Sequence, residues 1–348
     1  MLPFKIKQDT IGINKPCYIV AELSANHAGS LNKLKKLIID SKKAGANAVK
    51  IQAYEADKIT INSNNKEFLI NKKNPWKSYK NLFNLYKKAQ TPRKWYKEIF
   101  LFAKKNKITL FASVFDNATV GVLEKLNCPA YKIASAEITD IPLIERVAKT
   151  KKPIIISNGL ADLKDLKLAI KTIKKYNKKI IVLKCTASYP APVKTLNLKM
   201  IKFLRKKLKV LTGFSDHTLG ITSPVFAASQ GAVMIEKHIK INNEKKSVDS
   251  FFSIDTKEMG EMIKNIRTNE NSYGKVDYAI PQSARPNLKS RKSLFVIKDI
   301  EKGDFFSEKN IRSIRPSGGL HPKYFKKILG KKSKTNLKFG TALKSKHF

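Results

Sequence analysis

Two histidines end the last two of a series of apolar runs in the chain, and their spacing suits metal-assisted chemistry. His217 closes the run Gly-Phe-Ser-Asp-His at residues 213–217, and His238 closes Val-Met-Ile-Glu-Lys-His at residues 233–238. If both runs are parallel strands, both imidazoles emerge at the carboxyl-terminal edge of the sheet, where such folds bind ligands. Two neighbouring imidazoles suit a borderline divalent metal ion. The alternative is a pair of partly buried histidines that are hydrogen-bonded for packing.

Eight apolar or β-branched runs alternate with segments of helical spacing. This alternation indicates parallel strands buried on both faces. Eight such units within about 250 residues predict a TIM (β/α)8 barrel. A doubly wound open sheet is the alternative, but no Gly-x-Gly-x-x-Gly follows the first run, which disfavours a dinucleotide-binding sheet. The runs lie at 17–24, 48–54, 109–115, 130–135, 153–159, 180–186, 210–217 and 232–239.

Two parts of the chain fall outside this alternation. The connection at 55–89 is long for a barrel loop and carries Trp76, Tyr79 and Tyr86, so we expect a structured insertion over the barrel mouth. A polar, proline-punctuated stretch at 278–289 is typical of an interdomain linker. It would join a barrel domain at 1–277 to a small, mixed C-terminal domain at 290–348.

The charge balance is strongly basic, with 70 Lys+Arg against 27 Asp+Glu and a net charge of +43. The lysines are spread over nearly every helical segment instead of forming one stripe with aromatic or arginine readers. This pattern favours solvated helix faces and disfavours a nucleic-acid interface. A field of this sign still draws anionic small molecules toward a cleft.

The apolar stretches and the cysteines of the sequence bear on membrane association and on the cellular compartment. No stretch approaches the roughly 20 apolar residues of a membrane span, and the first residues lack the apolar region of a signal peptide. The cysteines Cys17, Cys128 and Cys185 lie far apart in apolar runs. We expect reduced thiols in a cytoplasmic protein with no membrane partner.

Polar and ionisable side chains collect at the predicted carboxyl ends of all eight strands. They are costly in a pure core, so an active site explains the set better than packing. Lysines among serine and asparagine donors suit an anionic, phosphorylated substrate, and carboxylates can orient water or move protons. A Schiff-base lysine is the rival chemistry. The set comprises Glu22, Ser24, Asn26, His27, Lys50, Gln52, Tyr54, Ser113, Lys132, Ser135, Glu137, Ser157, Asn158, Lys184, Thr186, Ser188, Tyr189, Ser215, Asp216, His217, Glu236 and His238, with Asp249 just beyond.

Several motifs, in order along the chain, resemble the sialic acid synthase family. They are Ala-Glu-Leu-Ser-Ala-Asn-His-Ala-Gly-Ser at 21–30, Val-Lys-Ile-Gln-Ala-Tyr at 49–54, Tyr-Lys-Ile-Ala-Ser-Ala-Glu at 131–137, Lys-Cys-Thr at 184–186 with Tyr-Pro at 189–190, Phe-Ser-Asp-His at 214–217 and Ile-Glu-Lys-His at 235–238. The C-terminal region resembles the antifreeze-protein-like (SAF) domain of these enzymes. Within the family, the motifs at 23–27 and 315–324 are most similar to pseudaminic acid synthases.

The resemblance implies a transferase that condenses phosphoenolpyruvate with an open-chain amino-deoxy sugar and releases phosphate by C–O cleavage. For a pseudaminic acid synthase the sugar is 2,4-diacetamido-2,4,6-trideoxy-L-altrose; sibling enzymes make N-acetylneuraminic or legionaminic acid. The resemblance also implies a domain-swapped homodimer in which Arg315 reaches into the other subunit's active site.

The resemblance further implies roles for the strand-end residues. His217 and His238 would hold a divalent cation (Mn²⁺, Mg²⁺ or Co²⁺). Glu22 would lie at the water that attacks the intermediate. Glu137, Tyr189 and Asp249 would contact the sugar or the outer shell of the metal. The residues implied to receive the phosphate and carboxylate of phosphoenolpyruvate are Lys50, Lys132, Ser135, Ser157 and Ser215, with Gln52 nearby.

Overall fold

The eight expected strands close into one parallel barrel, in the order β10-β3-β4-β5-β6-β7-β8-β9. A computed structural model describes all residues from 1 to 348. The TIM-barrel prediction is confirmed, and the open sheet is excluded because β10 pairs with both β3 and β9. The barrel strands are β3 (Tyr18–Glu22), β4 (Ala48–Ala53), β5 (Thr109–Val114), β6 (Tyr131–Ile133), β7 (Ile154–Ser157), β8 (Ile180–Cys185), β9 (Leu211–Asp216) and β10 (Met234–His238).

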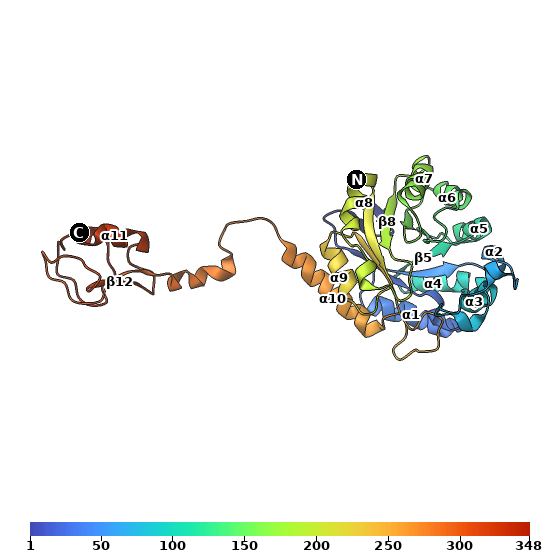
Figure 1. Ribbon diagram of the computed structural model, residues 1–348, viewed down its shortest axis with the longest axis horizontal. Coiled ribbons are helices and arrows are strands. Elements are labelled where there is room, and N and C mark those ends of the chain that lie inside the picture. The colour runs from blue at the N-terminus through green and yellow to red at the C-terminus, as the bar shows by residue number, and fades with distance from the viewer. The chain divides into compact units, whose positions relative to one another are not determined.

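Helices, most of them amphipathic, cover the outside of the barrel (Figure 1). In the first of them, Leu34, Leu37 and Ile38 are buried on one face, and Ser30 caps the amino end by accepting a hydrogen bond from the Lys33 backbone N–H. The helices are α1 (Leu31–Lys43), α4 (Tyr96–Lys105), α5 (Asn117–Lys125), α6 (Ile141–Ala148), α7 (Leu163–Lys174), α8 (Met200–Leu208), α9 (Thr222–Ser229) and α10 (Thr256–Tyr273).

Two elements have weak signals in the sequence. Helix α5 is short and contains Gly121, which weakens its helical signal; Asp116 caps it by accepting from the Thr119 backbone N–H. An antiparallel hairpin, β1 (Phe4–Ile6) and β2 (Asp9–Ile11), precedes the barrel. Its Ile6 and Ile11 side chains join the barrel core.

The long second connection is structured, as expected. It contains α2 (Ala56–Ile59), η2 (Lys66–Phe68), η3 (Lys77–Tyr79), α3 (Leu82–Ala89) and η4 (Arg93–Trp95). Trp76 Nε1 donates to the carbonyl oxygen of Val248, at 2.9 Å, in the loop that follows β10. Leu85, Ala89 and Val248 form a small apolar cluster there. The insertion therefore packs on the loops at the carboxyl-terminal end of the barrel, as the sequence predicted.

The chain divides into two units, Met1–Gly274 and Lys275–Phe348. The second unit begins just before the stretch predicted as a linker, most of which lies in η6 (Gln282–Ser290). Its core is formed by Leu294, Val296, Phe306, Ile311 and Leu343, among others. Its elements are β11 (Ser293–Val296) paired with β12 (Ile311–Ile314), η7 (Pro322–Tyr324), α11 (Phe325–Ile328) and η8 (Ser345–His347). No helix in the chain is long and apolar enough to cross a membrane.

Candidate active site

The register of the barrel brings strand-end side chains onto its inner face. Residues paired across neighbouring strands point to the same side of a sheet. Glu22 pairs with Lys50 and with His238, so these three share a face. The same holds for Ser113 with Lys132 and for Ser215 with Glu236. Polar residues at the carboxyl ends of six strands therefore lie together on the inner face of the barrel.

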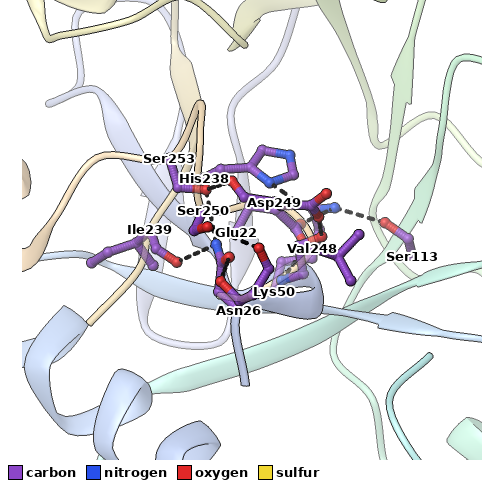
Figure 2. A network of polar contacts seen from close by, with 12 residues as sticks. Glu22, Asn26, Lys50, Ser113, His238, Ile239, Val248, Asp249, Ser250 and Ser253 are labelled. Carbon is purple, nitrogen blue, oxygen red and sulfur yellow. Dashed lines mark hydrogen bonds and ion pairs between the residues drawn. The ribbon is translucent and has the colours of Figure 1, made fainter. Parts of the chain in front are cut away.

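At the centre of this place, one carboxylate holds two lysines. Glu236 Oε1 accepts from Lys132 Nζ at 2.9 Å and from Ser215 Oγ at 3.1 Å, and lies 3.7 Å from Lys50 Nζ. Lys50 Nζ also donates to Ser113 Oγ at 2.7 Å (Figure 2). We call these five residues the lysine cluster. All five are buried.

The carboxylate and the ammonium groups of the lysine cluster stabilise one another in their charged forms. Burial alone would raise the pKa of Glu236, but the ammonium groups of Lys132 and Lys50 lower it to about 2. Burial would lower the pKa of Lys50, but Glu22 and Glu236 raise it above its ordinary value. Lys50 is therefore a cation at neutral pH, which suits an anion receptor and disfavours a Schiff-base nucleophile.

Glu22 lies beside this cluster. Its Oε2 forms an ion pair with Lys50 Nζ, and its Oε1 accepts from the Ser24 backbone N–H at 2.8 Å. Burial raises the pKa of Glu22 although Lys50 opposes the shift. A buried carboxyl with a raised pKa is suited to hold or move a proton.

The two histidines meet at the ends of β9 and β10. Their ring centroids are 5.3 Å apart. His217 Nδ1 lies 3.0 Å from the Thr186 carbonyl oxygen, which fixes Nδ1 as the protonated nitrogen and leaves Nε2 free. His238 Nδ1 is buried without a hydrogen-bond partner and lies 4.0 Å from Asp249 Oδ2.

The donor chemistry fits a divalent cation. Burial, together with the nearby His217 and lysines, holds the pKa of His238 well below its ordinary range, so its imidazole is neutral. Burial lowers the pKa of His217, but Cys185 and the Thr186 carbonyl raise it above its ordinary value, so a cation at that ring must displace a proton. No third His, Cys, Asp or Glu joins the pair in a ligand group, and water or substrate oxygens would complete the coordination.

Asp249 is hydrogen-bonded to the loop after β3, beside the histidines. Ser24 Oγ donates to Asp249 Oδ2, and burial raises the pKa of this carboxyl despite that bond. Asn26 Nδ2 donates to the Ile239 carbonyl and to Ser253 Oγ, both at 2.8 Å (Figure 2). Asn26 therefore positions the loop after β3 against the loop after β10.

The remaining predicted residues lie at the ends of β4, β6, β7 and β8. Ser135 Oγ accepts from the Gly159 backbone N–H at 3.0 Å, and Ser157 Oγ is buried without a partner. Burial raises the pKa of Glu137 to about 7. Tyr189 packs against His217 with the two rings tilted by 44° and their centroids 4.4 Å apart. Gln52 is partly buried and lies on the face of Ser113, its register partner.

Unsatisfied polar atoms concentrate here. Buried polar atoms in folded proteins nearly always have a partner. Of the ten buried side-chain atoms without a hydrogen-bond partner, five belong to residues of the candidate site and a sixth is His27 Nε2, after β3. The five are Glu22 Oε2, Glu137 Oε2, Ser157 Oγ, Glu236 Oε2 and His238 Nδ1, although Glu22 Oε2 is ion-paired with Lys50. Such a concentration is expected where a polar ligand supplies the partners.

Some strand-end residues point elsewhere. Asp216 and Lys237 pair with each other across β9 and β10 on the outer face, with Lys237 Nζ 2.6 Å from Asp216 Oδ2 and both fully buried. His27 accepts from the Gly29 backbone N–H and packs edge-on against Trp95, so its role is packing. Arg315 is an exposed residue of the second unit, after β12. Its predicted role in a partner's active site stays a prediction.

Sequence reasoning placed Glu236 at a strand end but gave it no function. The structure puts it at the centre of the lysine cluster. The signal that could have revealed it is spacing: Glu236 and His238 are two residues apart on one strand, so both must face the barrel interior.

Comparisons with known proteins agree with this geometry. The NeuB family model matches residues 37–278, and the SAF domain model matches residues 291–348. A pseudaminic acid synthase of Campylobacter jejuni is 42% identical over 336 residues, which cover 96% of this chain and 97% of that protein. An N,N'-diacetyllegionaminic acid synthase of the same species is 34% identical, with 93% and 98% covered.

A solved structure shows the same barrel. The N-acetylneuraminic acid synthetase of Leptospira borgpetersenii, crystallised with citrate, superposes with a TM-score of 0.73 at 29% identity, covering 82% of this chain and 95% of that one. The family matches span both units of the chain. The chain belongs to the NeuB family of sugar-acid synthases and carries a C-terminal SAF domain.

Proposed function

We propose that this enzyme is a pseudaminic acid synthase. It condenses phosphoenolpyruvate with 2,4-diacetamido-2,4,6-trideoxy-L-altrose and water to give pseudaminic acid and phosphate. The observation that carries the proposal is the buried lysine cluster beside a pair of imidazoles at one end of the barrel. The pseudaminic acid synthase of Campylobacter jejuni is more similar to this chain than the legionaminic acid synthase of that species is, at 42% against 34% identity.

The lysine cluster is the receptor for phosphoenolpyruvate. Lys50 and Lys132 are already held in place by Glu236, so they lose little side-chain freedom when an anion arrives. Ser215 and Ser113 supply hydroxyl donors at the same point, and Ser135 and Ser157 extend the donor set from the adjacent strands. Charged lysines and serine hydroxyls together match the phosphate and carboxylate oxygens of the substrate.

The histidine pair faces the aldehyde of the sugar. A divalent cation held by His217 and His238 would supply Lewis-acid polarisation of the aldehyde oxygen. In the reaction, C3 of phosphoenolpyruvate forms the new bond to the aldehyde carbon, water adds to C2, and the C2–O bond to phosphate breaks. The Asp249 carboxylate lies 4.0 Å from His238 Nδ1, beside this pair.

Two carboxyls are placed to handle the protons. Glu22 adjoins Lys50, at the side where the enol of phosphoenolpyruvate would lie, and is suited to take the proton of the attacking water. Glu137, whose pKa is raised to about 7, can exist in either form at neutral pH. It is suited to protonate the oxygen that becomes a hydroxyl.

The proposal extends to assembly and compartment. The enzyme works as a domain-swapped homodimer in the cytoplasm, and Arg315 of one subunit binds the N-acyl group of the sugar in the other. Its support is the resemblance of the 315–324 motif to pseudaminic acid synthases.

Phosphate release measured with phosphoenolpyruvate and each of three sugars tests the proposal. The altrose derivative should be turned over with the highest kcat/KM, and EDTA should abolish turnover until a divalent ion is returned. Preference for the legionaminic or N-acetylneuraminic precursor would assign a sibling activity instead. No phosphate release with any of the three sugars would refute a synthase function.

A further inference from the structure

Trp76 is the outer member of a group of aromatic rings at the barrel mouth. It comes from the insertion after β4, whereas its neighbours come from the loops after β8 and β10. Its ring centroid lies 5.3 Å from that of Tyr189, 5.8 Å from Phe251 and 6.4 Å from Phe252. We call these four residues the aromatic wall.

The aromatic wall continues inward to the histidine pair. Tyr189 lies 4.4 Å from the His217 ring and Phe252 lies 4.7 Å from the His238 ring, centroid to centroid. Tyr189 and Phe252 are 5.1 Å apart, so they form one surface. Trp76 packs on this surface from outside, at the end remote from the imidazoles.

The aromatic wall is chemically unlike the rest of the site. The only polar side-chain atom of Trp76 is the indole Nε1, whose N–H donates to the Val248 carbonyl at 2.9 Å. The Trp76 ring therefore presents only carbon, as do Phe251 and Phe252. The other polar side-chain atom of the aromatic wall is the hydroxyl oxygen of Tyr189. The charged groups for an anionic substrate lie instead on the lysine cluster.

This division orients the second substrate. If the proposed function is correct, the aldehyde end of the sugar lies at the histidines and phosphoenolpyruvate occupies the lysine cluster. The remaining carbons of the sugar then extend outward along the aromatic wall. Trp76, one ring further out than Tyr189, meets the end of the sugar that is remote from the aldehyde.

We infer that Trp76 is a specificity-determining residue that selects sugars whose terminal carbon is a methyl group over those that carry a hydroxyl there. The inference rests on the proposed function and deepens it. A terminal hydroxyl against the Trp76 ring loses its water partners and finds no acceptor or donor in exchange. A methyl group there gains contact with carbon.

The expected size of the sugar preference follows from the apolar character of the aromatic wall. An apolar pocket discriminates against an added hydroxyl by about 100-fold at most. Because Trp76 is only partly buried, a preference of about 10- to 100-fold for the 6-deoxy sugar over its 6-hydroxy analogue is expected. Removal of the indole should reduce that preference to a few-fold.

The test compares 2,4-diacetamido-2,4,6-trideoxy-L-altrose with the same sugar bearing a 6-hydroxyl. The kcat/KM of each is measured for the wild-type enzyme, Trp76→Ala and Trp76→Phe. Trp76→Ala should lower kcat/KM for the 6-deoxy sugar at least about threefold more than for the 6-hydroxy sugar, while KM for phosphoenolpyruvate is unchanged. Trp76→Phe should keep most of the preference. Equal losses on both sugars would overturn the inference and leave the synthase function standing.

The chain's other tryptophan provides a matched control and a second readout. Trp95 packs against His27, so Trp95→Phe should leave the sugar preference as in the wild type. In that variant Trp76 is the single tryptophan, and its fluorescence reports the wall directly. A saturable change on titration with the 6-deoxy sugar, at lower concentration than with the 6-hydroxy sugar, is expected even without turnover. No change, or equal changes with both sugars, would refute the role of Trp76 whatever the outcome of the activity assays.

Discussion

Replacement of Glu236 by glutamine removes the carboxylate at the centre of the lysine cluster while keeping nearly the same shape. The glutamine carbonyl can still accept one hydrogen bond, but Lys132 and Lys50 lose their shared counter-charge. Both ammonium groups stay buried, with Glu22 as the one remaining acidic partner, beside Lys50. The variant should therefore be less stable when no anionic ligand is bound.

The magnitude can be worked out from the ion-pair distances and from the pKa of Glu236. At an effective dielectric constant of about 20, the attraction is about 6 kcal/mol at 2.9 Å and about 4 kcal/mol at 3.7 Å, and several kcal/mol of desolvation offset it. The pKa of Glu236 falls from its ordinary value of 4.5 to about 2, which corresponds to about 3 kcal/mol. We expect the free energy of unfolding at pH 7 to fall by about 3 kcal/mol.

The pH dependence has a defined sign. Because the folded-state pKa of Glu236 is lowered, its contribution is fully present above the unfolded-state value near 4.5 and is lost as the pH falls toward about 2. The stability difference between wild type and Glu236→Gln should therefore be constant from pH 7 to about 5 and shrink below that.

Urea unfolding with and without inorganic phosphate provides the assay. Phosphate should raise the unfolding midpoint more for Glu236→Gln than for the wild type, because the ligand replaces the missing negative charge. Glu98→Gln, in an exposed pair with Lys35, is the matched control and should cost less than about 1 kcal/mol. If Glu236→Gln is as stable as Glu98→Gln and phosphate protects both equally, Glu236 does not hold the lysine cluster together.

Three further predictions concern the rest of the site. Since burial raises the pKa of Glu137 to about 7, its ionisation lowers the free energy of unfolding as the pH rises from about 4.5 to about 7. Glu137→Gln should remove up to about 3 kcal/mol of this loss of stability, measured by urea titrations at several pH values. An unchanged pH dependence of stability in this variant would contradict the raised pKa. His217→Ala should abolish phosphate release and weaken binding of Mn²⁺, measured by calorimetry, at least tenfold; retained affinity would exclude it as a ligand. Arg315→Ala should raise KM for the sugar at least tenfold without changing the unfolding midpoint of the barrel; full activity in a chain lacking residues 290–348 would refute its role.

The barrel was predictable because its signal is repeated and local. Buried parallel strands such as Ile154–Ser157 are apolar along nearly their whole length, and this strand is followed by a segment, Leu163–Lys174, whose apolar residues recur at helical spacing. The signal is weakest at helix α5, which contains Gly121, and the β1–β2 hairpin was not predicted because each of its strands is only three residues long.

The sequence indicated which residues belong to the candidate site but not which of them contact one another. Polar residues after apolar runs marked Lys50, Lys132 and His238, because such residues need a reason to be there. The sequence did not show that Asp216 pairs with Lys237 on the outer face while Glu236, one position earlier, faces the interior. That distinction depends on register, since a shift of one residue exchanges the two faces of a strand.

The sequence by itself determined the fold class, the family and the set of candidate residues, because periodicity and motif order are properties of the chain alone. Only the tertiary structure decided which of those residues touch. It joined Glu236 to two lysines from strands more than 100 residues away and brought Trp76 onto rings from the loops after β8 and β10. The physical reason is that barrel closure, which pairs β10 with β3, sets distances that no local pattern encodes.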